Sequence, residues 1–216
     1  MRTGTYWMPA QGEPTSTVLL RHGQTPMSVQ KRYAGRSDVP LTDLGVQQAA
    51  AAAKRLASVG LDVIVTSPLR RALRTAQEVA AATGAPLVTD EGFRETDFGA
   101  WEGLTFAEVR ERWPAEMTAW LADPAVAPPG GESFTEVSQR VTAALHRVLA
   151  AWERQAVLIV SHVTPIKMLV ANALLAPPAA LFRMHLNVAA LSEIDWYADG
   201  PALLRSFNDT SHLADE

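Results

Sequence analysis

The sequence has no cysteine among its 216 residues. Disulfide bonds, thiolate metal ligands and a cysteine nucleophile are therefore excluded. A surplus of basic residues is also missing, because 19 Lys and Arg stand against 23 Asp and Glu, and the formal net charge is −4. Proteins that bind nucleic acids or anionic membranes usually carry a basic stripe, so the charge balance argues against both partners.

Long hydrophobic runs are absent as well. No stretch approaches the roughly 20 apolar residues that a membrane-spanning helix requires. The opening segment, MRTGTYWMPAQGEPTST, lacks the continuous apolar core of a secretory signal. These absences predict a cytoplasmic protein that does not enter a membrane.

The composition that remains is that of a folded chain. Hydrophobic residues make up 48% and charged residues 19% of the sequence, which excludes wholesale disorder. Residues 1–16 are polar and interrupted by Gly and Pro, which predicts a flexible leader or an interdomain linker. Residues 17–216 have a length that suits one domain.

Short apolar runs alternate with helical patterns along this domain. Such an alternation is typical of an α/β fold with a mostly parallel sheet covered by helices on both faces. We expect strands over residues 17–20, 62–67, 85–90, 156–161, 189–198 and 201–207. We expect helices over residues 41–60, 68–82, 105–113, 133–152 and 164–175, the third of them ending at Pro114.

Polar, chargeable residues follow three of these strands at the point where each strand ends. Arg21 and His22 follow the first, Arg70 and Arg71 come soon after the second, and His162 ends the IVSH segment. Ligands of α/β sheets bind beyond the carboxyl ends of the strands, where helix N-termini also gather. The pattern indicates a phosphate site. The alternative is that these residues only end strands or lie on solvated helix surfaces.

Five segments carry a resemblance to a known family. They are LLRHGQT, TSPLRRALRTA, FRETDFGAWEGLT, PPGGES and IVSH, and they occur in this order between residues 17 and 207. In order and spacing they resemble the histidine phosphatase (phosphoglycerate mutase-like) superfamily. The resemblance implies a three-layer α/β/α fold with a central mixed, mainly parallel sheet, and phosphoryl-transfer chemistry.

The resemblance also implies the roles of five residues. His22 would be the nucleophile that becomes phosphohistidine, and Arg21 and Arg71 would hold the transferring phosphoryl group. His162 would complete the pocket, and Glu95 would donate a proton to the leaving oxygen. Fixed positive charge should lower the pKa of His22, and a backbone carbonyl should hold one of its ring nitrogens. Arg21 and Arg71 would supply that charge, so neither a metal nor another cofactor is implied.

Further residues are candidates for contacts with the substrate. They are Gln24, Thr25, Ser28, Arg36, Ser133 and Val163. Arg36 either reaches the substrate or braces its own loop, and Ser28 stands where many relatives have Asn. Gly23 is expected to let the chain turn closely past the phosphate, and Trp101 and Phe106 are expected to lie in the core.

The charge pattern favours a hydrolase over a mutase. Mutases of the family carry extra basic residues between the loop with the proton donor, here Glu95, and the later helix. Residues 113–139 of this chain contain no Lys or Arg. We therefore predict a phosphomonoesterase that acts on a small phosphorylated metabolite. The segments FGAWEGLT and GGES are similar to acid phosphatases and α-ribazole phosphatases. The alternatives are phosphoglycerate mutase-type transfer and a non-catalytic module that binds phosphorylated ligands.

A narrower resemblance concerns the organisation of the whole protein. The segment from TSTVLLRHGQT to the Ala run is similar to the C-terminal phosphatase domain of bacterial bifunctional ribonuclease H/acid phosphatase proteins. It implies an N-terminal ribonuclease H domain in a longer protein, joined through the leader at residues 1–16. The oligomeric state, including a homo-oligomer, stays open.

Overall fold

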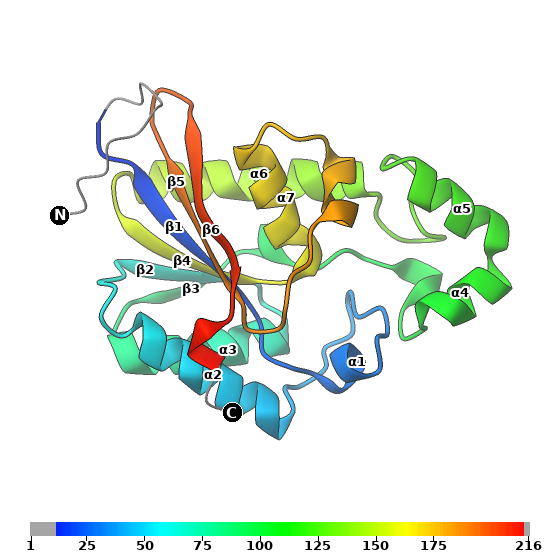
Figure 1. Cartoon of the computed structure of the whole chain (residues 1–216), viewed down its shortest axis with the longest axis horizontal. Helices are drawn as coiled ribbons and strands as arrows, with labels where there is room; N and C mark the ends of the chain where they lie inside the picture. The colour runs from blue at the N-terminus through cyan, green and yellow to red at the C-terminus, as the bar shows by residue number, and fades with distance from the viewer. Residues whose placement is uncertain (1–11, 214–216) are drawn as a thin grey trace.

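The computed structural model describes residues 12–213, and it contains one six-stranded sheet in the order β3-β2-β4-β1-β5-β6 (Figure 1). Strands β3, β2, β4 and β1 are parallel, whereas β5 pairs antiparallel with both β1 and β6. The strands are β1 (Thr15–Arg21), β2 (Val63–Thr66), β3 (Leu87–Thr89), β4 (Ala156–Ser161), β5 (Leu191–Trp196) and β6 (Ala202–Asp209). The predicted mixed, mainly parallel sheet is confirmed.

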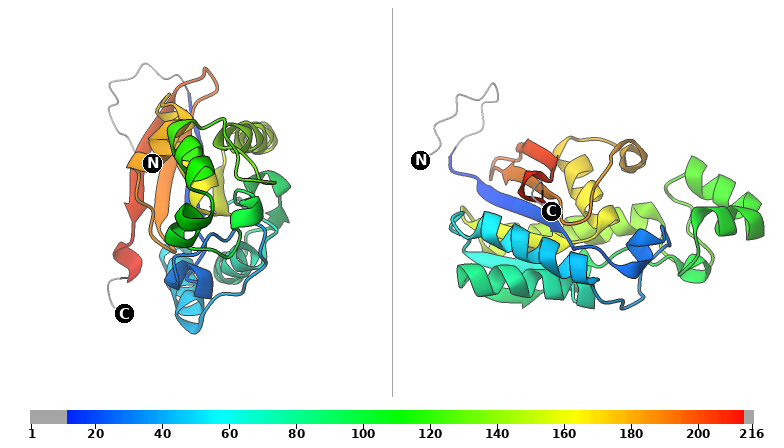
Figure 2. Two further views of the ribbon diagram at one scale, coloured as in Figure 1. Left: turned by 90° about the vertical axis from the view of Figure 1, so that its right-hand side faces the viewer. Right: turned by 60° about the horizontal axis from the view of Figure 1, so that its bottom comes forward.

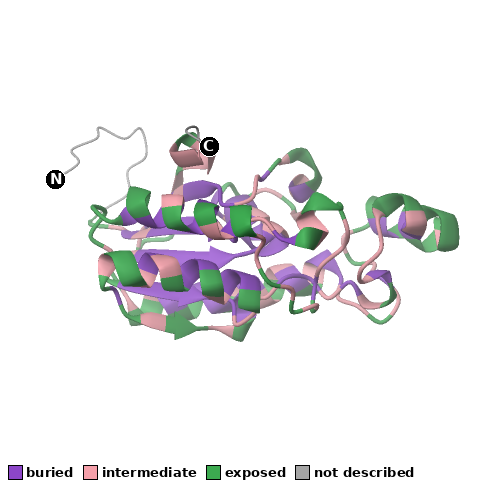
Figure 3. Cartoon of the chain, turned by 90° about the horizontal axis from the view of Figure 1, so that it is seen from below, coloured by how far each residue is buried: buried purple, intermediate pink, exposed green. Residues whose placement is uncertain are grey.

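Helices cover the sheet on both faces, so the three-layer prediction is also confirmed. These helices are α2 (Asp43–Leu56) and α3 (Arg70–Thr83) on one face, and α6 (Phe134–Ala151) and α7 (Val163–Ala173) on the other. Alternate residues of β1 serve the two layers: Val18 and Leu20 pack with α2 and α3, and Leu19 packs with α6 and α7. Figure 3 shows the strands buried between helices whose outer faces are exposed.

Shorter elements gather at one end of the sheet. Strand β1 points towards this end, where α1 lies and beyond which α4 and α5 extend (Figures 1 and 2). These elements are α1 (Pro26–Val29), α4 (Phe106–Arg112), α5 (Pro114–Ala122) and the 3-10 turns η1 (Glu91–Phe93), η2 (Gly99–Trp101) and η3 (Pro178–Arg183), whereas the turn η4 (Ser211–Leu213) packs on α2. Trp101 is fully buried there, as predicted.

The start of the chain differs from the prediction. Strand β1 begins at Thr15, because residue 15 pairs with Trp196 and Ser16 pairs with both Ala156 and Asp195. Thr15 and Ser16 therefore belong to the sheet and not to the leader. Residues 1–11 lie outside the described part of the chain.

One helix boundary and one core residue were wrong, and one helix was missed. Helix α3 begins at Arg70 rather than Pro68, since Leu69 has an extended backbone, and the side chain of Asp38 accepts the Arg70 N–H at 2.7 Å. Helix α4 ends before Pro114, as predicted, but Pro114 also opens the unpredicted α5 at the first helical position, where its missing N–H costs nothing. Phe106 is 45% exposed and does not lie in the core.

Between residues 12 and 213, no helix has both the length and the apolar content to cross a bilayer.

Candidate active site

Two histidines meet at the carboxyl ends of β1 and β4. The strands are parallel neighbours with Arg21 opposite Ser161, so the residues that follow each strand are brought side by side. The rings of His22 and His162 lie 5.1 Å apart between centroids. Both side chains are buried. The sheet register thus joins two residues that are 140 positions apart in the sequence.

His22 is held in one tautomer. Its Nδ1 lies 2.8 Å from the carbonyl oxygen of Gly23. A carbonyl can only accept, so Nδ1 carries the proton and the lone pair is left on Nε2. Burial and the charges of Arg71 and Arg21 lower the pKa of His22 well below its usual range. The ring therefore stays neutral at mildly acidic pH, as a nucleophile must.

The Arg21 guanidinium is only partly engaged by the protein. Its Nη1 donates to the carbonyl of Leu186 at 2.6 Å. Its Nε is buried, and no residue between 12 and 213 accepts a hydrogen bond from it. Burial lowers the pKa of Arg21 to about 10, so the group keeps its charge at neutral pH. A buried, charged donor without an acceptor is suited to bind an anion.

Arg71 is fully engaged and forms the back of the site. Its Nε donates to Nδ1 of His162 at 3.2 Å, and its remaining nitrogens donate to the carbonyls of Ala34, Gly35 and Ser37. The Nε2 of His162 then carries the proton and donates to the Ser67 hydroxyl at 2.7 Å. Arg71 thus orients His162 and holds the loop at residues 34–37 against the site.

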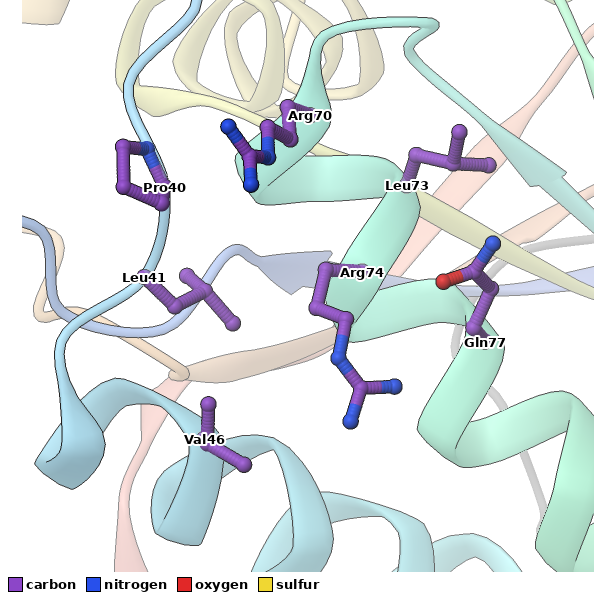
Figure 4. A pocket seen from close by; sticks show the side chains of 7 residues that line it. All are labelled: Pro40, Leu41, Val46, Arg70, Leu73, Arg74 and Gln77. Carbon is purple, nitrogen blue, oxygen red and sulfur yellow. The ribbon is translucent and has the colours of Figure 1, made fainter.

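Arg70, its neighbour in the sequence, faces a different hollow. Figure 4 shows Arg70 and Arg74 around a surface cavity between α2 and α3, together with the apolar side chains of Leu41, Val46 and Leu73. No imidazole or carboxylate lines this cavity. Helix α3 therefore places Arg71, and not Arg70, against His162.

Glu95 lies at the N-terminus of α7. Its carboxylate accepts hydrogen bonds from the backbone N–H groups of Val163, Thr164 and its own neighbour Thr96, at distances of 2.9 to 3.2 Å. The side chain is buried and lines the same cavity as His22. The backbone N–H groups therefore hold a carboxyl group at fixed orientation beside the nucleophile.

A cavity of about 220 Å³ opens over these groups. Its lining residues are Arg21, His22, Thr25, Ser28, Arg32, Tyr33, Ala34, Glu95, Phe98, Val163 and Thr164. Of the candidates for substrate contact, Thr25, Ser28 and Val163 lie on its wall. Arg71 and His162 do not line the cavity but lie behind His22.

The other three candidates for substrate contact lie elsewhere and make local contacts. Gln24 accepts a hydrogen bond from the N-cap hydroxyl of Thr42. Arg36 pairs with Asp97 at 2.9 Å, and its side chain is 65% exposed. Ser133 caps α6. Arg36 therefore braces its loop, which was one of its two predicted roles.

Comparison with known proteins identifies the family. The model of the histidine phosphatase superfamily (branch 1) matches residues 17–210. The chain belongs to this superfamily. The Mycobacterium tuberculosis (strain H37Rv) "Bifunctional protein Rv2228c" is 48% identical over 98% of this chain and 58% of its own length. "Probable phosphoglycerate mutase GpmB" of Proteus mirabilis is 35% identical over 91% of the chain and 94% of that protein.

Solved structures agree with this assignment. Bacillus stearothermophilus YhfR matches with a TM-score of 0.86 and 34% identity, covering 92% of this chain and 99% of that one. The mycobacterial glucosyl-3-phosphoglycerate phosphatase Rv2419c matches with a TM-score of 0.83 and 33% identity, over 91% and 100%. The superfamily and these neighbours support a phosphoryl-transfer enzyme. The chain spans 58% of the length of Rv2228c.

Gly23 has a packing role that the sequence did not indicate. A Cβ at Gly23 would lie 2.3 Å from the carbonyl oxygen of Gly45 in α2. A Cβ at Gly45 would in turn lie 2.1 Å from the carbonyl oxygen of Gln24. Gly23 thus allows the loop that follows His22 to pack on the first turn of α2. The expected passage beside the phosphate stays a prediction.

Sequence reasoning missed part of the cavity wall. Tyr33 and Phe98 line it, and neither residue was predicted to do so. The available signal was that Tyr33 lies in the segment after His22 and that Phe98 lies shortly after Glu95. No periodicity could show that these two loops face each other.

Sequence reasoning also missed a set of ion pairs and hydrogen bonds, here called the clamp, around the loop that carries Glu95. Arg140 of α6 donates to both carboxylate oxygens of Glu132, at 3.0 and 2.9 Å. The same guanidinium donates to the carbonyls of Gly92 and Arg94, and Glu132 accepts the N–H of Asp97 at 3.0 Å. Bidentate pairs of this kind fix geometry as well as charge. The clamp binds both sides of Glu95.

We expect Arg140→Met to lower kcat about tenfold or more while KM changes less, because Glu95 would lose its fixed orientation. The loss should be larger for an alkyl phosphate than for a nitrophenyl phosphate, since only the alkyl ester depends strongly on an acid. Arg147→Met is the matched control, because Arg147 lies on the same helix but pairs with Asp90. Equal losses in the two variants would contradict the role of Arg140.

Acidic and imidazole groups do not cluster elsewhere in the described residues. Between residues 12 and 213, no group of three or more His, Asp or Glu side chains is arranged to hold a metal ion.

Proposed function

We propose that this histidine phosphatase hydrolyses phosphomonoesters through a phosphohistidine at His22. The observation that supports this most strongly is the pairing of a neutral imidazole, held by the Gly23 carbonyl, with the unpartnered Nε of Arg21. The first group can attack phosphorus. The second can bind the phosphoryl oxygens, whose charge must be stabilised as the ester bond breaks.

The proposed reaction has two steps. In the first, Nε2 of His22 attacks phosphorus, the ester P–O bond breaks, and Glu95 gives its proton to the leaving oxygen. In the second, the Glu95 carboxylate takes a proton from a water molecule whose oxygen attacks phosphorus. The P–N bond then breaks, Nε2 recovers its lone pair, and inorganic phosphate leaves. Arg21 and Arg71 supply fixed positive charge in both steps, which makes a metal unnecessary.

Phosphoglycerate mutase activity is the second candidate, and the 35% identity to GpmB favours it. A mutase must hold a second anionic group of its substrate. Among the described residues 12–213, the cations that line the cavity are Arg21 and Arg32, and Glu108 pairs with Arg32 at 2.9 Å. Hydrolysis is therefore the better supported activity.

Two finer assignments belong to the proposal. The similarity of FGAWEGLT and GGES to α-ribazole phosphatases makes a ribazole phosphate one candidate substrate. The match to Rv2228c, a protein named as bifunctional, supports a second domain N-terminal to this one, for which a ribonuclease H domain is the candidate. In that arrangement residues 1–11, outside the described part of the chain, would join the domains.

The test uses the purified chain with an excess of EDTA. We expect release of phosphate from p-nitrophenyl phosphate at the same rate with and without the chelator. With 3-phosphoglycerate, free phosphate should form faster than its 2-phospho isomer. An isomer that forms faster than phosphate would establish the mutase instead, and loss of all turnover in EDTA would contradict the metal-independent mechanism.

A further inference from the structure

An aromatic wall stands opposite the catalytic groups. Tyr33 and Phe98 both line the cavity, with ring centroids 4.7 Å apart. Trp101 and Trp120 pack behind Tyr33, at 6.1 and 6.2 Å between centroids, and pack edge-to-face on each other at 5.4 Å. Aromatic pairs at these separations are favourable and restrict ring motion. The wall is therefore a rigid surface in the same cavity as His22.

The polar groups near this wall are mostly occupied. Arg32 donates to Gly103 and Glu108, so its charge is already balanced. The hydroxyls of Thr25 and Ser28 bond to each other's backbone groups in a capping box. A second anion on a substrate would thus lose water at the wall without gaining a free cation, which is unfavourable.

Tyr33 adds a hydroxyl group to the wall that it forms with Phe98. Burial raises the pKa of Tyr33 to about 12, so the group remains a neutral O–H across the physiological range. A neutral donor beside a ring face suits an uncharged hydroxyl, ether or ring nitrogen on a ligand.

We propose that the Tyr33–Phe98 wall selects phosphomonoesters whose leaving group is uncharged and carries a flat face, and that it disfavours those with a second carboxylate or phosphate. This selectivity rests on the proposed hydrolase function. The catalytic groups bind the phosphate that all substrates share. The wall contacts only the leaving group, which differs from one substrate to the next.

The experiment compares two alkyl esters whose leaving oxygens have similar acidity, 2-phenylethyl phosphate and 3-carboxypropyl phosphate. We expect kcat/KM to be at least about tenfold higher for the phenyl ester in the unaltered protein. Tyr33→Leu and Phe98→Leu should each reduce this ratio severalfold by lowering only the value for the phenyl ester. Phe106→Ala is the matched control, because this exposed aromatic residue lies outside the cavity and its loss should leave the ratio unchanged.

A gain of activity provides a second arm. Glu108→Gln keeps an oxygen that can accept the Thr105 N–H but removes the charge that balances Arg32. We expect kcat/KM for the carboxylated ester to rise about threefold, while that for the phenyl ester stays the same. Two results would contradict selection by the Tyr33–Phe98 wall. The unaltered protein could hydrolyse both esters equally well, or the Tyr33→Leu and Phe98→Leu variants could lose activity on both esters equally. Either result would leave the proposed hydrolase function intact. Failure to release phosphate from either ester or from p-nitrophenyl phosphate would instead overturn the proposed function.

Discussion

Replacing His22 by alanine is expected to lower kcat for p-nitrophenyl phosphate by at least about 10⁴-fold. The reason is that no other group in the cavity offers a neutral nitrogen with a free lone pair. The Nδ1 of His162 already accepts from Arg71, and its Nε2 donates to Ser67. The measurement is the steady-state rate of phosphate release, with circular dichroism to verify that the variant is folded.

Trapping the phosphorylated intermediate tests whether His22 itself is the nucleophile. The unaltered protein, quenched in alkali during turnover, should carry an acid-labile phosphate, since a P–N bond survives base and not acid. His22→Ala should carry none. His146→Ala is the matched control, because this histidine lies exposed on α6 and should leave both rate and labelling unchanged. If labelling persists in His22→Ala and disappears in His162→Ala, the nucleophile is His162, at the end of β4, and not His22.

The second large effect is expected at Glu95. Glu95→Gln should lower kcat about 100-fold or more for an alkyl phosphate but only a few-fold for p-nitrophenyl phosphate. An alkoxide leaves poorly without a proton, whereas nitrophenolate leaves well without one. The measurement is the dependence of log kcat on leaving-group pKa, which should become steeper in the variant.

A structural effect of the same substitution must be separated from the chemical one. The amide of glutamine would place an NH₂ group against the N–H of Val163 or Thr164, so the N-terminus of α7 would lose one acceptor. The melting temperature of the variant reports this loss. Thr164→Ala is the control, because it keeps the backbone N–H and the carboxyl group. Equal losses of kcat for good and poor leaving groups would refute proton donation by Glu95.

Local sequence signals predicted most of the architecture. The apolar runs at residues 17–20, 62–67 and 156–161 are continuous because both faces of these strands are buried, and this alone indicates a covered parallel sheet. The capping box of Ser133 and Glu136 placed the start of α6 correctly. Pro114 ended α4 as predicted, but the start of α5 at the same residue was missed, since a proline can both end one helix and begin the next.

The site was predicted unevenly for a physical reason. Arg21, His22 and His162 follow strands whose ends must meet in a parallel sheet, so their proximity follows from the strand pattern. Glu95 lies in a loop without periodicity, and only the family motif singled it out. Arg140 gave no signal at all, because an arginine on an amphipathic helix is usually solvated.

The sequence by itself determined the layers of this protein, the two histidines at the strand ends and the absence of thiol chemistry. Tertiary structure alone decided which nitrogen of His22 is free, that Arg71 is bound by the protein while the Nε of Arg21 is not, and that Tyr33 faces Phe98. The first set depends on contacts between near neighbours or on the regular geometry of a sheet. The second depends on loops distant in sequence, whose mutual positions are set by the packing of the whole domain.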